Sequence, residues 1–313
     1  MKRVLVTGAT GFIGRHVVQV LSQRGYEVHA VGRRASPVAA DCGYSHRSDL
    51  LVPGVAAQLI KDVAPEGLIH LAWEVGHGGA WRSDLNDRWR EATVDLVGAF
   101  AAPDRRAILA GTCAEYRWDN SLCVEGATPI TPSTPYGQAK DAAREGAQVI
   151  AQEAGLSLAW ARIFFTFGPG EAPERLVPSV IRAVLSGEAA ETTHGMQIRD
   201  YLYVEDLADA LVTLLESDLQ GEINVASGEP TRLKWLAARA AEMAGDARRL
   251  KLGARSARPH EPERILADVS RLDRDVGWHP RIGLEDGLAR TVGWWRATTA
   301  QGESGAGSGD SFP

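Results

Sequence analysis

The apolar residues in the first half of the chain alternate between short β-branched runs and longer stretches with helical spacing. In residues 12–24, Ile13, Val17 and Val20 recur at intervals of three or four, and the stretch ends before Gly25, which is typical of an amphipathic helix. The same pattern predicts strands over 2–6, 26–31, 67–73, 105–111 and 156–165, and helices over 12–24, 56–63, 83–101 and 136–154. Because these strands do not alternate with polar residues, we predict a parallel sheet covered by helices on both faces.

The alternation of predicted strands and helices is less regular after residue 167. Helices are expected over 175–185, 204–216, 232–244 and 284–296, and strands over 198–204 and 222–227. We therefore predict an α/β fold, a Rossmann-type doubly wound parallel sheet with a smaller C-terminal substrate-binding lobe over its carboxyl edge. The expected domains are a dinucleotide-binding domain over 1–165 with sheet additions from about 198–226, a lobe over 166–297, and a disordered tail over 298–313 that is rich in Gly and Ser.

Composition and charge exclude several classes of protein. The chain has 313 residues, 44% of them hydrophobic, and a net charge of −6, which argues against binding to nucleic acid or to an anionic membrane. No run approaches the roughly 20 apolar residues of a membrane helix, and we predict no metal ligand set. The three cysteines are Cys42, Cys113 and Cys123, with no CxxC pair, so we expect reduced thiols in a cytoplasmic protein.

A glycine-rich motif stands between the first predicted strand and the first predicted helix. Residues 7–14 read TGATGFIG. In such a motif Gly8 permits the tight turn, Gly11 lets the backbone approach a pyrophosphate, and Gly14 lets helix and strand pack closely. The alternative is an ordinary glycine-rich turn, but the strand–turn–helix context favours a dinucleotide site. The cofactor-binding residues expected here are Gly8, Thr10, Gly11, Phe12, Ile13 and Gly14.

The end of the second predicted strand bears on the choice of cofactor. NAD enzymes place Asp or Glu there to bind the ribose hydroxyls, whereas this chain has Arg33 and Arg34 after Gly32. Because guanidinium groups pair with a 2′-phosphate, NADP(H) is favoured over NAD(H), although solvated surface arginines are the alternative. Asp49 and Leu50 are candidates for contact with the adenine. The alternative is that Asp49 lies in an exposed loop.

Three side chains suit proton transfer to a ketone. Tyr136 and Lys140 stand four residues apart at the start of a predicted helix, so they share a face. Thr112 ends a predicted sheet strand, where ligands bind in such sheets. A nearby ammonium would lower the pKa of the tyrosine, and the threonine hydroxyl would hold the substrate oxygen. A Tyr–Lys pair at this spacing also occurs on solvated helix faces.

These motifs together resemble the extended short-chain dehydrogenase/reductases, the NAD-dependent epimerase/dehydratase family that acts on nucleotide sugars. The resemblance extends to about Arg296 and implies that Tyr136 is the acid/base, that Lys140 binds the nicotinamide ribose, and that Thr112 holds the reacting oxygen. It further implies cofactor contacts from Leu71, Ala72, Trp73, Tyr136, Lys140, Ile163 and Phe165, and contacts with a nucleotide-diphosphate sugar from Glu74, Thr112, Cys113, Ala114, Phe164, Val177, Arg199, Arg258 and Glu261. It also leads us to expect a homodimer formed by helices 83–101 and 136–154. For Arg199 and Arg258, surface salt bridging is the alternative.

Departures from the family pattern narrow the reaction. Dehydratases carry Asp-Glu after the Ser/Thr, where this chain has Cys113 and Ala114, so elimination of water is disfavoured. The cysteine and histidine positions of the epimerase–reductases that make GDP-fucose are occupied here by Ala114 and Gly170, which disfavours that chemistry. Reduction of a 4-keto-6-deoxy sugar with NADPH is favoured. C4 epimerisation is the alternative, and it is less favoured because Phe165 stands where many C4 epimerases have Asn. A non-catalytic NADP-binding sensor is the alternative from another class.

The loop after the third predicted strand is rich in aromatic residues. Glu74, His77 and Trp81 are candidates to line the sugar pocket. The alternative is that these side chains, together with Trp89 and Trp118, pack or lie on the surface.

Overall fold

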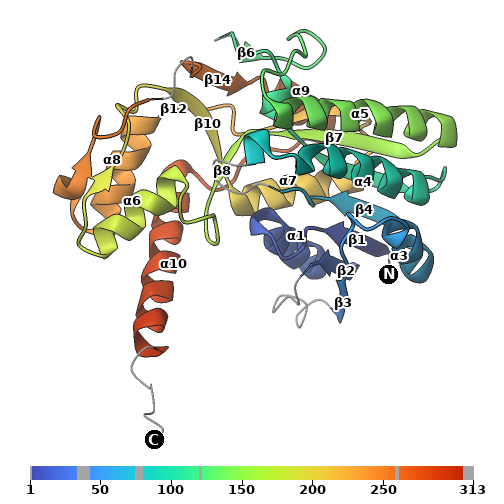
Figure 1. Cartoon of the computed structure of the whole chain (residues 1–313), viewed down its shortest axis with the longest axis horizontal. Coiled ribbons are helices and arrows are strands. Elements are labelled where there is room, and N and C mark those ends of the chain that lie inside the picture. Colours follow the sequence, from blue (N-terminus) through green and yellow to red (C-terminus); the bar gives the residue numbers. More distant parts are fainter. Residues whose placement is uncertain (1, 34–42, 75–79, 120–121, 258–260, 306–313) are drawn as a thin grey trace, which may run out of the picture.

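A seven-stranded parallel sheet organises the N-terminal part of this computed structural model, which describes residues 2–33, 43–74, 80–119, 122–257 and 261–305. The strands run in the order β11-β7-β5-β4-β1-β2-β3 (Figure 1). Their bounds are β1 Arg3–Thr7, β2 Glu27–Gly32, β3 Gly43–Arg47, β4 Gly67–His70, β5 Arg106–Thr112, β7 Ser157–Ile163 and β11 Gly221–Val225. The order reverses between β1 and β4, so the predicted doubly wound Rossmann fold is confirmed.

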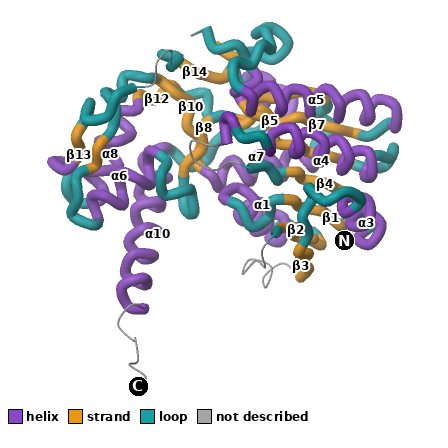
Figure 2. The backbone as a smooth tube through the Cα atoms, in the orientation of Figure 1, coloured by secondary structure: helices purple, strands orange, loops and turns teal. Residues whose placement is uncertain are grey.

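Helices cover both faces of this sheet because its strands are apolar on both sides (Figure 2). In β1, Val4 and Val6 pack against α1 (Phe12–Gln23) and α7 (Val204–Glu216). Leu5 faces the opposite way, toward α3 (Val55–Val63), α4 (Leu85–Phe100) and α5 (Pro135–Ala154). Helices α4 and α5 pack side by side, and dimerisation through them stays a prediction.

The second part of the chain forms a smaller lobe next to the sheet (Figure 1). A second sheet has the order β12-β10-β14-β6, with β8 also paired to β10. Its strands are β6 Leu122–Cys123, β8 Phe165–Phe167, β10 Ile198–Tyr203, β12 Pro230–Arg232 and β14 Arg264–Ala267, and a short pair is formed by β9 Ala190–Glu191 and β13 Leu250–Lys251. The remaining helices are α6 Leu176–Leu185, α8 Leu233–Ala244, α9 Ser270–Val276 and α10 Leu284–Gly305, with 3-10 turns η1 Ala80–Arg82, η2 Cys113–Glu115 and η3 Ala247–Arg249.

Two sequence predictions about this part need correction. Residues 198–203 do not add to the large sheet, because β10 pairs with β8, β12 and β14 instead. Residues 298–305, predicted to be disordered, continue helix α10. This helix is held at the lobe by buried Trp295, which lies in the core shared with α6 and α8. None of the helices in the described residues is long and apolar enough to cross a membrane.

Candidate active site

The glycine motif forms a tight loop at the carboxyl end of β1. Gly8 has a φ of 69°, a conformation that favours glycine, and Gly11 donates its N–H to the Gly8 carbonyl at 2.9 Å. A Cβ on Gly8 would lie 2.8 Å from the amide nitrogen of Ala72, and one on Gly14 would lie 2.1 Å from the Gly8 oxygen. The loop therefore has the close backbone approach expected of a dinucleotide site, with Thr10 in the loop and Phe12 and Ile13 opening α1.

The adenosine end of the predicted site lies beyond β2. Arg33 follows Gly32 and is exposed, and Arg34 lies outside the described residues. Asp49 accepts a hydrogen bond from the Leu51 amide at 3.0 Å, so its carboxylate holds its own turn, and Leu50 is buried beside it.

Buried His70 ties the end of β4 to the glycine loop. Its two ring nitrogens are hydrogen-bonded to the hydroxyls of Thr7, at 2.6 Å, and Thr93, at 2.9 Å. Burial, and then the charge of Lys140, lower the pKa of His70 to about 3, so the imidazole is neutral. The Thr7 hydroxyl also accepts the Ala72 N–H at 3.3 Å, which fixes the backbone of Leu71 and Ala72 next to the loop.

Helix α5 begins so that Tyr136 faces the end of β5. The side chain of Thr134 caps the helix by accepting the Gly137 N–H at 3.1 Å, and Pro135 occupies its first turn. The Thr112 hydroxyl accepts the Ala114 N–H at 3.2 Å and is hydrogen-bonded to the Tyr136 phenol. The structure thus brings together the two oxygens that the sequence predicted.

Lys140 lies in the same region, and its ammonium is directed at the end of β5 and at the Trp73 ring. Its ammonium donates to the Ala110 carbonyl at 2.8 Å and stands 3.9 Å from the centre of the Trp73 ring. Burial lowers the pKa of Lys140 to about 7, and Glu115 opposes that shift. Burial likewise raises the pKa of Tyr136, against the hydrogen bond with Thr112, and the lowering of this pKa by Lys140 stays a prediction.

Aromatic side chains surround the Tyr136 ring. Trp81 and Trp73 meet it edge-on, with ring centres at 5.4 and 6.2 Å. Trp81 also contacts Trp118, which donates to the Cys113 carbonyl at 2.8 Å. These tryptophans cover part of the half-buried Tyr136 side chain and place Trp81 at the site. His77 lies outside the described residues, Trp89 is buried behind Trp73, and Glu74 accepts a hydrogen bond from Ser83.

The lobe contributes a buried arginine. Arg199 pairs with Glu261 at 3.0 Å and lies over the Phe165 ring, with its guanidinium carbon 5.5 Å from the ring centre. It is thus in a salt bridge, the alternative considered from the sequence, although Arg199 itself is buried and only Glu261 is partly exposed. Arg258 lies outside the described residues.

Some predicted contact residues have side chains in the core instead. Val177 packs in the lobe core, and Phe164 packs beside Tyr116 in a cluster that also contains Cys113. Phe164 and Val177 are both buried, and their contacts with the sugar stay a prediction. Ala114 is buried, and Ile163 is only half-buried at the end of β7.

Residues that the sequence reasoning missed come from the loop before α6. Arg175 lies close enough to Tyr136 to lower its pKa, and it also lies near Glu171 and Tyr201. Glu171 is buried, and its Oε2 has no hydrogen-bond partner among the described residues. The signal was the charged stretch GEAPER in an otherwise apolar region.

The buried carboxyl of Glu171 predicts a pH-dependent stability. Burial raises the pKa of Glu171 from 4.5 to about 8, so the folded chain holds a proton that the unfolded chain releases. Stability is therefore lost as the pH rises from about 4.5 through 8. Each pKa unit is worth about 1.4 kcal/mol. The free energy of unfolding of Glu171→Gln, relative to that of the unsubstituted protein, should therefore rise by several kcal/mol from pH 5 to pH 8.5, as measured by denaturant unfolding. Glu174→Gln, at an exposed position, is the control, and a constant difference for Glu171→Gln at both pH values would contradict the prediction.

Comparisons with known proteins agree with this geometry. Residues 4–226 match the model of the NAD dependent epimerase/dehydratase family. The chain is 26% identical to UDP-glucuronic acid decarboxylase 1 of Xenopus tropicalis, over 94% of this chain and 72% of that protein. It is 26% identical to UDP-glucose 4-epimerase of Azospirillum brasilense, over 98% and 96%. Among solved structures, MoeE5 in complex with UDP-glucose and NAD superposes with a TM-score of 0.84 at 31% identity, covering 95% of this chain and 99% of that one.

Proposed function

The chain belongs to the NAD-dependent epimerase/dehydratase family, and from this premise we propose that it reduces the C4 ketone of a nucleotide-activated 4-keto-6-deoxyhexose. The observation that carries the proposal is the Thr112–Tyr136 hydrogen bond at the carboxyl edge of the sheet. Beside this pair stand Cys113 and Ala114, which cannot serve as the acid and base of an elimination. The arrangement therefore suits proton delivery to a carbonyl oxygen and no loss of water.

The residues present fit a nicotinamide dinucleotide. The glycine loop is a cradle that a Cβ on Gly8 or Gly14 would fill, and the start of α1 presents amide groups to a pyrophosphate. Arg33, Asp49 and the backbone of Leu71–Ala72 would complete its binding site. When bound, the dinucleotide supplies the hydride that carbon C4 receives.

The chain's own residues provide the proton and the orientation. Tyr136 donates its phenolic proton to the ketone oxygen, and Thr112 holds that oxygen by a hydrogen bond. The raised pKa of Tyr136 favours the protonated phenol, which is the form that a reduction uses. Lys140 would turn toward the ribose and the phenolate, and Arg199 and Arg175 would bind the substrate phosphates.

C4 epimerisation is the second candidate. A relative over almost the whole chain is a UDP-glucose 4-epimerase, and the related MoeE5 structure holds NAD. An epimerase oxidises and re-reduces the same carbon, so it consumes no added cofactor. A non-catalytic NADP sensor remains a third reading, which the Tyr136–Thr112 contact argues against.

Arg33 makes the preference for NADPH testable. Arg33→Ser should weaken the binding of NADPH by at least about tenfold and leave NADH unchanged, because a charge-assisted hydrogen bond to the 2′-phosphate is worth about 1.5–3 kcal/mol. Fluorescence titration with both cofactors measures the two affinities. An equal loss for NADH and NADPH would show that Arg33 does not read the phosphate.

The reaction is tested with a panel of nucleoside diphosphate 4-keto-6-deoxyhexoses and NADPH. We expect loss of the nicotinamide absorbance together with formation of the 4-hydroxy sugar for at least one nucleotide. If no ketone in the panel consumes NADPH while a UDP-hexose is converted to its C4 epimer without added cofactor, the epimerase is the correct assignment.

A further inference from the structure

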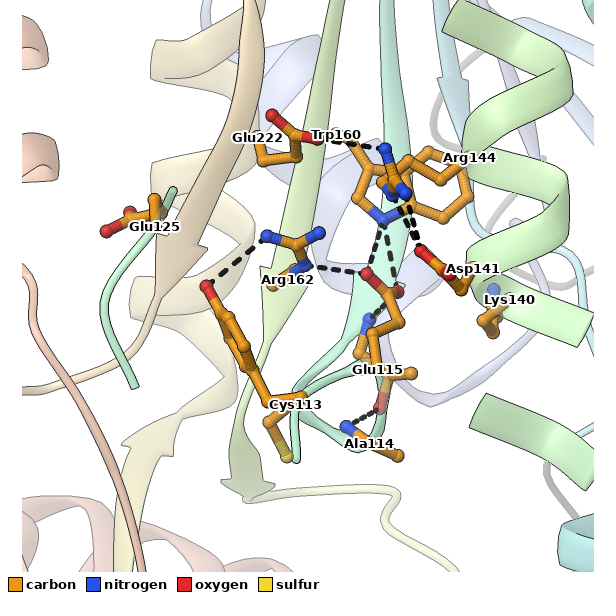
Figure 3. Close-up of polar contacts among 12 residues, drawn as sticks. Cys113, Ala114, Glu115, Glu125, Lys140, Asp141, Arg144, Trp160, Arg162 and Glu222 are labelled. Atoms are coloured by element: carbon orange, nitrogen blue, oxygen red, sulfur yellow. Dashed lines mark hydrogen bonds and ion pairs between the residues drawn. The ribbon is translucent and has the colours of Figure 1, made fainter. Parts of the chain in front are cut away.

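A buried carboxylate lies directly behind the catalytic threonine. Glu115 is 0% exposed, and in Figure 3 its side chain lies between Trp160 and Arg162. The Trp160 indole N–H is 3.1 Å from both carboxylate oxygens, and the Arg162 Nε donates to Oε2 at 2.6 Å. The proposed reaction gives Glu115 no task as an acid or base, so its burial needs another explanation.

The carboxylate holds the backbone of the residue that orients the substrate. Its Oε1 accepts the Thr112 N–H at 2.8 Å. The Thr112 hydroxyl accepts the Ala114 N–H at 3.2 Å, so the two bonds form a capping box across the turn η2. Together they fix both the backbone and the side chain of Thr112.

The other end of this contact is anchored in the sheets. The Arg162 Nη1 donates to the Tyr116 hydroxyl at 3.3 Å, which donates to the Asn224 Oδ1 at 2.8 Å. The Asn224 amide donates in turn to the carbonyls of Cys123 and Asp268, at 2.9 and 3.1 Å. Thr112 is therefore connected through Glu115 to strand β11 and to the segment that follows β14.

A glycine makes room for the carboxylate. A Cβ on Gly111 would lie 2.2 Å from the Trp160 Nε1 and 2.8 Å from the Glu115 Oε1. Any other residue at 111 would displace the indole or the carboxylate. Gly111 is thus required for this arrangement of Glu115 and Trp160.

We propose that Glu115 is a positioning residue, which holds the Thr112 hydroxyl in line with Tyr136 by fixing the turn 112–115 against Arg162 and Trp160. A buried ion pair often contributes less to stability than apolar residues of similar size, whereas a buried hydrogen-bonded network fixes one geometry. Among the described residues Arg162 Nη2 has no partner in this network. The inference rests on the proposed function, because it assigns Glu115 to the orientation of the hydroxyl that holds the substrate oxygen in that reaction.

The charge of Glu115 also reaches the reacting groups. It raises the pKa of Lys140, which burial lowers. It also raises the pKa of Tyr136, which burial raises as well. The other titratable groups near this pair are His70 beside Lys140, and Cys113 and Arg175 beside Tyr136. Neutralising Glu115 therefore lowers both pKa values, which moves the alkaline limit of ketone reduction to lower pH.

The first test is Glu115→Gln in the full chain. We expect kcat to fall by about 10- to 100-fold, because a misplacement of about 1 Å can cost about 100-fold, and we expect the alkaline limb of kcat/KM to move to lower pH. The affinity for NADPH, measured by fluorescence titration without a sugar, should stay within about twofold.

A second variant guards against misfolding, because Glu115→Gln leaves Arg162 buried without its partner. The double variant Glu115→Leu/Arg162→Met removes both charges; we expect it to fold, to bind NADPH and to show the same fall in kcat. Asp209→Asn is the matched control. Asp209 also joins an arginine and an indole, since it pairs with Arg24 and accepts the Trp278 N–H at 2.8 Å, but it lies on α7, away from Thr112.

The outcomes separate this inference from the proposed function. If the unsubstituted protein reduces no ketone, the proposed function fails first. If the unsubstituted protein is active and both Glu115 variants keep its kcat and pH profile, the positioning role is wrong. The role is equally wrong if kcat and NADPH binding fall in parallel in both variants, since that pattern is a general loss of structure.

Discussion

Tyr136→Phe should lower kcat for ketone reduction by about a thousandfold while it leaves NADPH binding intact. The substitution removes the phenolic proton, and general acid catalysis is worth about 10²- to 10⁴-fold. The ring itself stays between Trp81 and Trp73, so the shape of the site is kept. Steady-state kinetics on the reactive ketone and a fluorescence titration with NADPH give the two quantities.

Tyr26→Phe is the control for this variant. Tyr26 donates to Glu216 at 3.1 Å, where α1 and α7 meet, so its loss should leave kcat unchanged. Turnover of Tyr136→Phe within about tenfold of the unsubstituted protein would show that another group supplies the proton.

Gly14→Ala should abolish measurable dinucleotide binding and destabilise the fold. The new Cβ would lie 2.1 Å from the Gly8 oxygen and 2.7 Å from the Ala9 Cα. Both are backbone atoms, so the loop itself must move. Overpacking of this kind costs about 1–3 kcal/mol of unfolding free energy, and the displaced loop loses its approach to the pyrophosphate. Thermal unfolding and NADPH titration measure the two effects.

Gly293→Ala is the matched control. Gly293 lies in helix α10, and a Cβ there would meet no atom within 4 Å. Alanine should therefore stabilise the helix by about 0.5–1 kcal/mol and leave binding unchanged. Binding of NADPH by Gly14→Ala at unchanged affinity would contradict the placement of the dinucleotide at this loop.

The large sheet and its loop could be predicted because their signals are local. The β-branched strands, the helix after Gly14 and the Tyr136–Lys140 spacing each depend on neighbouring residues. Strand β3 was missed because GYSHR is polar and its five residues lie at the edge of the sheet, so it lacks an apolar period. Strand β10 was placed in the wrong sheet because its pairing partners lie far along the chain.

The site was predicted in part for the same reason. Thr112 and Tyr136 meet because strand β5 and helix α5 end at the same edge, which the topology implies. The direction of Lys140 depends on the Ala110 carbonyl and the Trp73 ring, and the burial of Glu115 depends on Trp160 and Gly111. Such contacts are set by packing between distant segments, so no spacing in the sequence reveals them.

Transfer of deuterium from labelled NADPH to the sugar tests the central claim most directly. If the chain reduces a ketone at C4 with Tyr136 as the acid, the product of the unsubstituted protein carries deuterium at C4, and Tyr136→Phe forms almost none. A sugar product without deuterium, or an unsaturated sugar formed by loss of water, would contradict the account.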